Sequence, residues 1–106
     1  MNLFADIRSL VLSTLDTLVA DGFLPEGLSF DAITVEPPRD AAHGDMATNA
    51  AMVLAKPARM KPRDIAEKLA EKLAEDPRIT AADVAGPGSL NLRLSAAVWQ
   101  GVVGAV

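Results

Sequence analysis

Apolar residues recur at helical spacing in two long stretches of the chain. Residues 2–21 place them three or four positions apart, which predicts an amphipathic helix that ends before Gly22. Residues 62–75 repeat the pattern, and Pro62 stands where the first turn of a helix tolerates proline. The apolar positions of the predicted buried faces are Leu3, Ile7, Leu10, Val11, Leu15, Leu18 and Val19 in the first stretch and Ile65, Leu69 and Leu73 in the second.

Strict alternation over residues 89–94 predicts a strand with one buried and one polar face. The turn sequence Gly-Pro-Gly at 86–88 joins it to a less regular strand over 79–85. A third strand is predicted over 33–36, where two prolines end it. On the most regular strand, the residues predicted to face inward are Leu90, Leu92 and Leu94. The residues predicted to face outward are Ser89, Asn91 and Arg93.

The segment between the first predicted strand and the second long helix has a weaker pattern. Residues 39–46 predict a polar connection with room for a short edge strand. Residues 47–55 are mostly alanine, methionine, valine and leucine, which predicts a helix that Asp45 or Thr48 caps. Pro57 is expected to end that helix, because proline disfavours helical backbone in the residue before it.

A last helix is predicted over 96–105, so the expected order of elements is α-β-α-α-β-β-α. This order predicts an α+β fold, a two-layer sandwich in which helices cover a mainly antiparallel sheet of three to four strands. The length of 106 residues suits a single domain that spans residues 1–106.

The composition limits which residues can form the core and which kinds of chemistry the chain can perform. Half of the residues are hydrophobic but only 4% are aromatic, so the core must consist mostly of leucine, valine, isoleucine, methionine and alanine. The chain has no cysteine, which excludes disulfides, thiol catalysis and cysteine-ligated zinc within it. No basic leader precedes the apolar pattern and no run is long enough to cross a bilayer, so we expect a cytoplasmic protein without membrane contact.

No catalytic constellation is visible. His43 and Asp45 stand two apart, but one imidazole and one carboxylate are too few ligands for a metal site, so we expect no metal. The Gly-Pro-Gly turn at 86–88 lacks the lysine and hydroxyl residue of a phosphate-binding loop, and its proline removes an amide donor. The sequence therefore favours a binding or structural module over an enzyme.

The net charge of −4 argues mildly against nucleic-acid binding, but the charges are unevenly distributed. Residues 55–63 read AKPARMKPR and contain four basic side chains and no acidic one. Two interpretations stay open, namely a solvated connection between helices and a surface that contacts phosphates. The four basic residues are Lys56, Arg59, Lys61 and Arg63.

Three motifs in fixed order carry a family resemblance. They are VEPPRDAAHGDMATNAAMVLAK at 35–56, KPRDIAEKLAEKL at 61–73 and VAGPGSLNLRLS at 84–95. Together they resemble the N-terminal additional domain of arginyl-tRNA synthetases, within the class I aminoacyl-tRNA synthetases. The resemblance covers nearly the whole chain.

That resemblance implies a non-catalytic, monomeric α+β domain that recognises the D-loop corner of arginine tRNA. It implies that the parent enzyme is a cytoplasmic ligase of protein biosynthesis, which attaches arginine to its tRNA. The domain itself would hold no cofactor, and the catalytic domain, which follows it in the chain, would use ATP. The alternative is an intramolecular docking or protein-interaction module with little direct RNA contact.

The resemblance also places RNA contacts on the hairpin strand, where Asn91 matches the family's asparagine. Family members often carry phenylalanine or tyrosine two positions earlier, where an aromatic ring stacks on a base. This chain has Ser89 there, which puts stacking at that position in doubt. The full set of candidate RNA-binding residues is Asn91, Arg93, Ser89, Lys56, Arg59, Lys61, Arg63 and His43.

Overall fold

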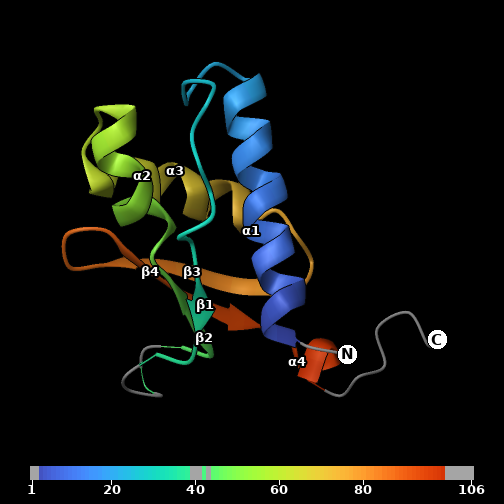
Figure 1. The fold of residues 1–106 in the computed structure, drawn as a ribbon. Helices are drawn as coiled ribbons and strands as arrows, with labels where there is room; N and C mark the ends of the chain where they lie inside the picture. The colour runs from blue at the N-terminus through green and yellow to red at the C-terminus, as the bar shows by residue number, and fades with distance from the viewer. Residues whose placement is uncertain (1–2, 39–41, 43, 100–106) are drawn as a thin grey trace.

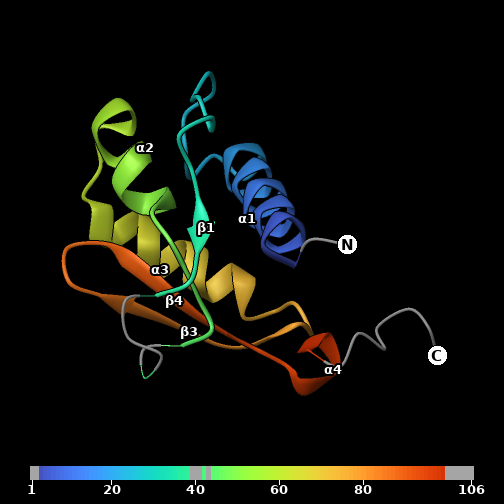
Figure 2. The ribbon, with the colours of Figure 1, turned by 60° about the horizontal axis from the view of Figure 1, so that its bottom comes forward.

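In the computed structural model, which describes residues 3–38, 42 and 44–99, helices cover one face of an antiparallel sheet (Figures 1 and 2). This arrangement confirms the predicted α+β two-layer fold. The elements are α1 (Leu3–Ala20), β1 (Val35–Glu36), β2 (Met46–Thr48), α2 (Ala50–Ala58), α3 (Pro62–Leu73), β3 (Ile79–Ala85), β4 (Ser89–Leu94) and α4 (Ala96–Trp99).

The sheet has four strands in the order β1-β2-β4-β3, and every neighbouring pair is antiparallel. The hairpin of β3 and β4 follows the sequence prediction, with its turn at 86–88 and a left-handed φ of 57° at Gly86. The order places β2 and β4, which are distant in sequence, side by side at the centre of the sheet.

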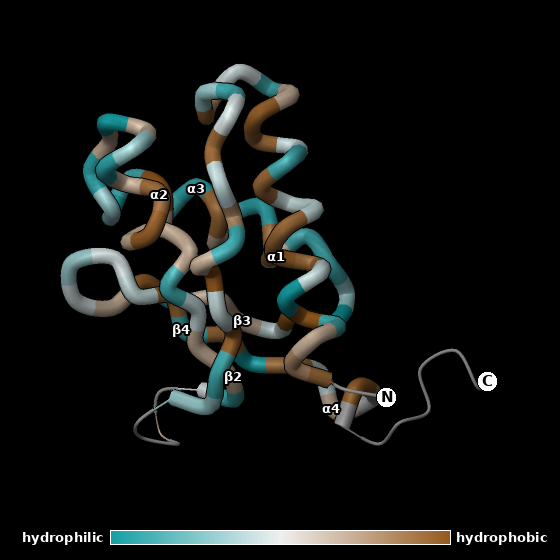
Figure 3. Tube along the Cα trace, viewed as in Figure 1, coloured by the Kyte–Doolittle hydropathy of each residue, from teal (hydrophilic) through white to brown (hydrophobic). Residues whose placement is uncertain are grey.

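The core lies between the helices and the inner face of the sheet. The predicted apolar faces of α1 and α3 are the buried ones, and Figure 3 shows brown and teal segments alternating along α1. Among the described residues, Thr48 is the buried polar side chain, at 3% exposure, so the core is almost wholly aliphatic. The largest fully buried side chains are Ile7, Val11, Leu15, Leu18, Ile33, Met46, Leu54, Ile65, Leu69, Leu73, Leu90 and Leu92.

The segment around β2 differs from its prediction. Ala47 and Thr48 belong to a strand instead of a helix, and this strand lies inside the sheet instead of at its edge. Pairing with β1 on one side and β4 on the other satisfies its backbone groups, which outweighs the weak helical preference of these residues. The helix α2 consequently begins only at Ala50, and the Thr48 hydroxyl accepts the Ala50 N–H at 3.3 Å.

Pro57 does not end α2, contrary to the prediction. The helix continues to Ala58, and the next residue, Arg59, takes a left-handed conformation with φ 57°. The Met60 N–H then bonds the Ala55 carbonyl at 3.0 Å, and the Arg59 N–H bonds the Lys56 carbonyl at 3.1 Å. This closing pattern satisfies the last carbonyls of the helix, so the left-handed residue ends it where the proline does not.

The last predicted helix is observed only as α4, and residues 100–105 of that prediction lie outside the described residues. Within the described part of the chain, no helix is both long and apolar enough to cross a membrane.

Candidate nucleic-acid interface

The face of the sheet opposite the helices carries a row of side chains that crosses all four strands. Glu36 on β1 pairs with Ala47 on β2, Ala47 pairs with Asn91 on β4, and Asn91 pairs with Asp83 on β3. Directly paired residues project their side chains to the same face. Asn91 therefore stands between a methyl group and a carboxylate at the centre of this open face.

Asn91 is half-buried and lies opposite the leucines of β4, as the alternation predicted. Among the described residues, none forms a hydrogen bond with its side-chain amide. The amide consequently offers two donors and one acceptor to a ligand. An amide can pair with the edge of a base, so the chemistry of this position suits RNA contact.

Arg93, two residues along the same face, is exposed but already has a partner. Its guanidinium donates to the Ala42 carbonyl oxygen at 2.7 Å. Arg93 thus holds the segment before β2 against the sheet, which accounts for one of its donors. The RNA contact predicted for Arg93 rests on the donors that remain.

The segment that leads into β2 is built around close contacts with β4. Gly44 has φ 136°, and a Cβ at this position would lie 2.8 Å from the Leu92 carbonyl oxygen. Asp45 accepts the Leu94 N–H at 2.8 Å through its carboxylate, so it holds a strand instead of capping a helix. These contacts give Gly44 and Asp45 an architectural role. His43, predicted to contact RNA, lies outside the described residues.

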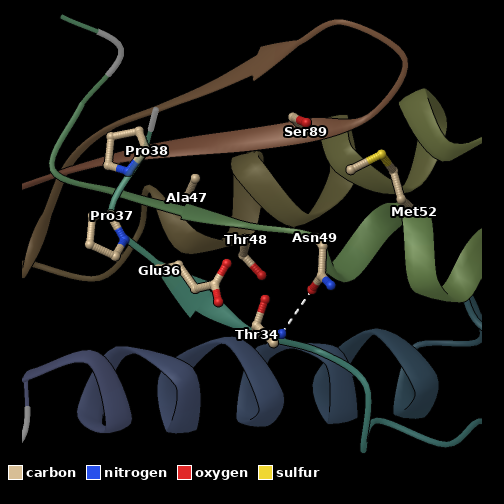
Figure 4. A pocket seen from close by; sticks show the side chains of 9 residues that line it. All are labelled: Thr34, Glu36, Pro37, Pro38, Ala47, Thr48, Asn49, Met52 and Ser89. Carbon is tan, nitrogen blue, oxygen red and sulfur yellow. Dashed lines mark hydrogen bonds between the residues drawn. The ribbon is translucent and has the colours of Figure 1, made fainter. Parts of the chain in front are cut away.

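Asn49 closes the other end of β2. Its side-chain oxygen accepts the Thr34 N–H at 2.8 Å (Figure 4), and its side-chain nitrogen donates to the Ala32 carbonyl at 3.2 Å. These two bonds hold the approach to β1 against the start of α2. The two bonds hold the edge of the open face in place, and neither of them involves a side chain of the row that crosses the sheet.

The basic segment and the hairpin turn meet, although they are far apart in sequence. The Arg63 guanidinium donates to the Gly86 carbonyl at 3.2 Å and lies 3.4 Å from the Glu67 carboxylate. A Cβ on Gly88 would lie 2.6 Å from the Cβ of Pro62, so the turn packs tightly on the start of α3. The fold thereby brings one end of the basic segment next to the strand that carries Ser89 and Asn91.

The other three basic side chains, Lys56, Arg59 and Lys61, are all exposed. They belong to the end of α2 and the connection to α3, which lies on the same side of the molecule as the β3–β4 turn in both ribbon views (Figures 1 and 2). Among the described residues, none forms an ion pair with them. Their charges are therefore available to an anionic partner.

A groove of about 220 Å³ opens between the open face of the sheet and the start of α2 (Figure 4), and its lining includes Ala47, which pairs with Asn91. Its walls are mostly uncharged and include two prolines, an alanine and a methionine. Glu36 is the charged member of this described lining. The lining residues are Thr34, Glu36, Pro37, Pro38, Ala47, Thr48, Asn49, Met52 and Ser89.

Of these residues, only Ser89 was a sequence-based candidate. Met52 is 41% exposed and is the exposed large hydrophobic side chain among the described residues. Its position in an apolar helix gave no sign that it would face outward. Glu36 carried a signal, since the alternation over 33–36 put it opposite the buried Val35, but nothing in the sequence paired it with Ala47.

The shifted pKa values lie away from this face, at the connection between α3 and β3. The Arg78 guanidinium donates two hydrogen bonds to Asp76 at 3.0 Å, which lowers the pKa of that carboxyl and raises the pKa of Arg78. A carboxyl group whose pKa is lowered by folding stabilises the folded state at pH values above its ordinary pKa of 3.8. This stabilisation is lost as the pH falls through the lowered pKa of the folded state. The pair therefore supports the fold in the neutral range.

Among the described residues, no cluster of three or more histidine, cysteine or carboxylate side chains could hold a metal ion. The carboxylate of Asp45 is engaged with the backbone of β4, which removes it from the histidine–aspartate pair considered above.

Comparison with known proteins gives a consistent result. Residues 5–94 match the family model of the arginyl tRNA synthetase N terminal domain. The chain is 73% identical over 104 residues to the "Arginine--tRNA ligase" of Ruegeria sp. (strain TM1040), covering 98% of this chain and 18% of that protein. It is 68% identical over 103 residues to the protein of the same name from Paracoccus denitrificans (strain Pd 1222), covering 97% and 18%. The chain thus spans about a fifth of the length of these curated relatives.

Proposed function

This chain belongs to the family of arginyl-tRNA synthetase N-terminal domains, and from that premise we propose that it recognises the D-loop corner of arginine tRNA. The complete protein would be an arginine–tRNA ligase, monomeric and cytoplasmic. Within it, this domain would bind RNA and take no part in the chemistry.

One observation supports this proposal most. The amide of Asn91, which has no hydrogen-bond partner in the described part of the chain, stands at the centre of the open face, and the contact between Arg63 and Gly86 brings basic surface next to the same strand. An amide suits a base edge, and lysine and arginine suit phosphates, which supply most of the affinity for nucleic acids. The two kinds of group together match a folded RNA that offers both.

The proposal assigns arginine activation and the use of ATP to the rest of the ligase. The 106 residues contain no phosphate-binding loop and no nucleophile motif. Pyrophosphate exchange with ATP and arginine, measured on these residues alone with and without tRNA, should stay at the level of a buffer control. Turnover clearly above that level would contradict the non-catalytic role.

The decisive variant is Asn91→Ala in the complete ligase. Losing one hydrogen bond should cost about 0.5–1.5 kcal/mol, or a several-fold drop in kcat/KM for tRNA. The KM values for arginine and ATP should stay constant at saturating tRNA. Ser13→Ala, which changes an exposed side chain on α1, is the matched control and should leave all three unchanged.

A double-mutant cycle identifies the nucleotide that Asn91 reads. Changing that D-loop nucleotide should cost the unmodified ligase more than it costs the Asn91→Ala variant. Additive losses for every D-loop nucleotide would show that Asn91 reads none of them. The RNA-facing surface would then be sought first around Lys56, Arg59, Lys61 and Arg63.

The docking alternative has one observation in its favour. The carboxylates of Glu36 and Asp83 share the open face with Asn91, and acidic groups repel phosphates but attract a basic protein surface. Binding of arginine tRNA that weakens with salt favours recognition of RNA, because phosphate contacts release counterions. Salt-insensitive association with the catalytic part of the ligase, together with no response to tRNA, favours docking.

A further inference from the structure

The connection between α2 and α3, residues 59–61, holds a cation at a backbone position that normally takes glycine. Arg59 has φ 57° and ψ 42°, and in the part of the chain that the structure describes it is the non-glycine residue with a positive φ. A left-handed residue at the end of a helix is usually glycine, because a Cβ is strained there. The end of the helix therefore explains the conformation of Arg59 but not the choice of arginine.

The backbone of this connection is fixed at both ends. Backbone hydrogen bonds from the N–H groups of Arg59 and Met60 close the last turn of α2. Lys61 is extended, with φ −70° and ψ 135°, as expected for a residue that precedes a proline. Met60 is half-buried and packs against the core. Because the backbone beneath Arg59 is already ordered, only its side chain must lose freedom when it binds a ligand.

No residue in the described part of the chain engages the charge of Arg59. Its side chain is exposed, and none of the described residues forms an ion pair or a hydrogen bond with it. Arg63, by contrast, donates to the Gly86 carbonyl at 3.2 Å and lies 3.4 Å from the Glu67 carboxylate. Arg59 thus combines an unfavourable backbone conformation with an available cation, and such outliers are kept where they serve a function.

The distribution of charge indicates which anion this cation meets. Residues 55–63 contain four basic side chains and no acidic one. On the open face of the sheet, by contrast, Glu36 and Asp83 share the row of Asn91. Carboxylates repel phosphates, so an RNA that lays a base edge on Asn91 needs a separate place for its backbone. The connection offers that place, because it lies on the same side of the molecule as the β3–β4 turn (Figures 1 and 2).

We propose that Arg59 binds a backbone phosphate of the tRNA that Asn91 contacts, and that this contact retains an arginine at the strained end of α2. The inference rests on the proposed function and deepens it, since it names the part of the RNA that meets the connection and the residue that holds it. Phosphate contacts fix the position of a nucleic acid without reading its sequence. Arg59 should therefore contribute affinity for every variant of the tRNA alike.

The first test separates strain from charge at position 59. Arg59→Gly removes both, so the 106-residue chain should melt about 2–5 °C higher, while the complete ligase should bind arginine tRNA about 3- to 10-fold more weakly at low salt. Arg59→Ala keeps the strain and removes the charge, so it should weaken binding as much and leave the melting midpoint nearly unchanged. A residue with a merely structural role would not move stability and affinity in opposite directions.

The second test measures how salt acts on binding by the complete ligase. For Arg59→Ala, the slope of log affinity against log salt should fall by about 1, because one phosphate contact is lost. Arg59→Lys retains a positive charge and should keep the slope. Lys72→Ala is the matched control, since that lysine lies 4.0 Å from the Glu75 carboxylate, and it should change neither slope nor affinity. A loss confined to one D-loop variant of the tRNA would assign Arg59 to base reading and overturn the inference.

The outcomes distinguish this inference from the function on which it rests. If Asn91→Ala impairs charging but Arg59→Ala and Arg59→Gly leave affinity and slope unchanged, the domain reads tRNA without a phosphate on Arg59. If none of the three variants has an effect, the proposed function fails as well. A lower melting midpoint for Arg59→Gly would show that position 59 is not strained, and it would overturn the inference that binding retains arginine there.

Discussion

The two faces of β4 are made from alternate residues of one six-residue strand, yet different physics governs them. On the inner face, Leu90 and Leu92 are fully buried against the helices, and Leu94 is nearly so. On the outer face, Ser89 and Asn91 are half-buried and Arg93 is exposed. Burial of apolar surface selects the first set, whereas in the second set Arg93 bonds the Ala42 carbonyl and Asn91 forms no side-chain hydrogen bond with the described residues.

The comparison separates residues that hold the fold from residues that are free to bind. Every inner side chain packs against neighbouring side chains, so the size and polarity of the residue at that position are constrained. On the outer face, the side chain of Arg93 is tied to a carbonyl, whereas that of Asn91 has no partner among the described residues. A substitution should therefore have opposite consequences on the two faces, for stability on one and for binding on the other.

The largest expected effect comes from Leu92→Asp. Placing a carboxylate at this fully buried position should cost at least about 3 kcal/mol and unfold much of the population at ordinary temperature. Thermal melts provide the measurement. Asn91→Asp introduces the same group one residue away on the open face and should move the midpoint by only a few degrees. Equal losses from the two variants would show that the faces do not differ.

Gly44→Ala should have the next largest effect, because it tests contact within the plane of the sheet. The added Cβ would meet the Leu92 carbonyl at 2.8 Å while the backbone keeps an unfavourable φ of 136°. We expect a loss of about 1–3 kcal/mol in unfolding free energy. Gly22 also has a positive φ, but a Cβ at this position would meet no atom within 4 Å. Chemical denaturation of Gly22→Ala should therefore show a smaller loss of unfolding free energy. The reverse order would contradict the close approach to β4.

The smallest effect is expected from Lys61→Ala, which sharpens the comparison on the binding side. Lys61 is exposed at the start of α3, and its removal should leave the melting midpoint unchanged. Binding of arginine tRNA should weaken evenly across tRNA variants, and the slope of log affinity against log salt should fall by about 1. Lys72→Ala is the control, because it also removes one positive charge, but from a position where the lysine is paired with Glu75. A slope that falls equally for Lys72→Ala would rule out a localised basic contact.

Much of the architecture was predictable because its signals are local. Four-residue spacing in α3 and strict alternation in β4 identify each element and its buried face without knowledge of any partner. The same alternation placed Asn91 on the outer face, and the ordered motifs identified the family that the comparisons confirm.

The central strand β2 was not predictable, since three residues carry too short a pattern to distinguish strand from helix. Met-Ala-Thr becomes a strand only because β1 and β4 lie on both sides to accept its hydrogen bonds. Asp45 was misread for the same reason: its partner, the Leu94 N–H, is 49 residues away. Interactions of this range leave no trace in the local sequence.

The sequence by itself therefore determined the elements, their buried faces and the identity of the candidate RNA-binding strand. Tertiary structure alone decided which side chains share a surface. It set Glu36, Ala47, Asn91 and Asp83 in one row, and it turned Met52 toward Ser89 to form a groove. The reason is physical: the periodicity of a strand or helix is encoded in adjacent residues, whereas strand order and register depend on pairing between segments that meet only when the chain folds.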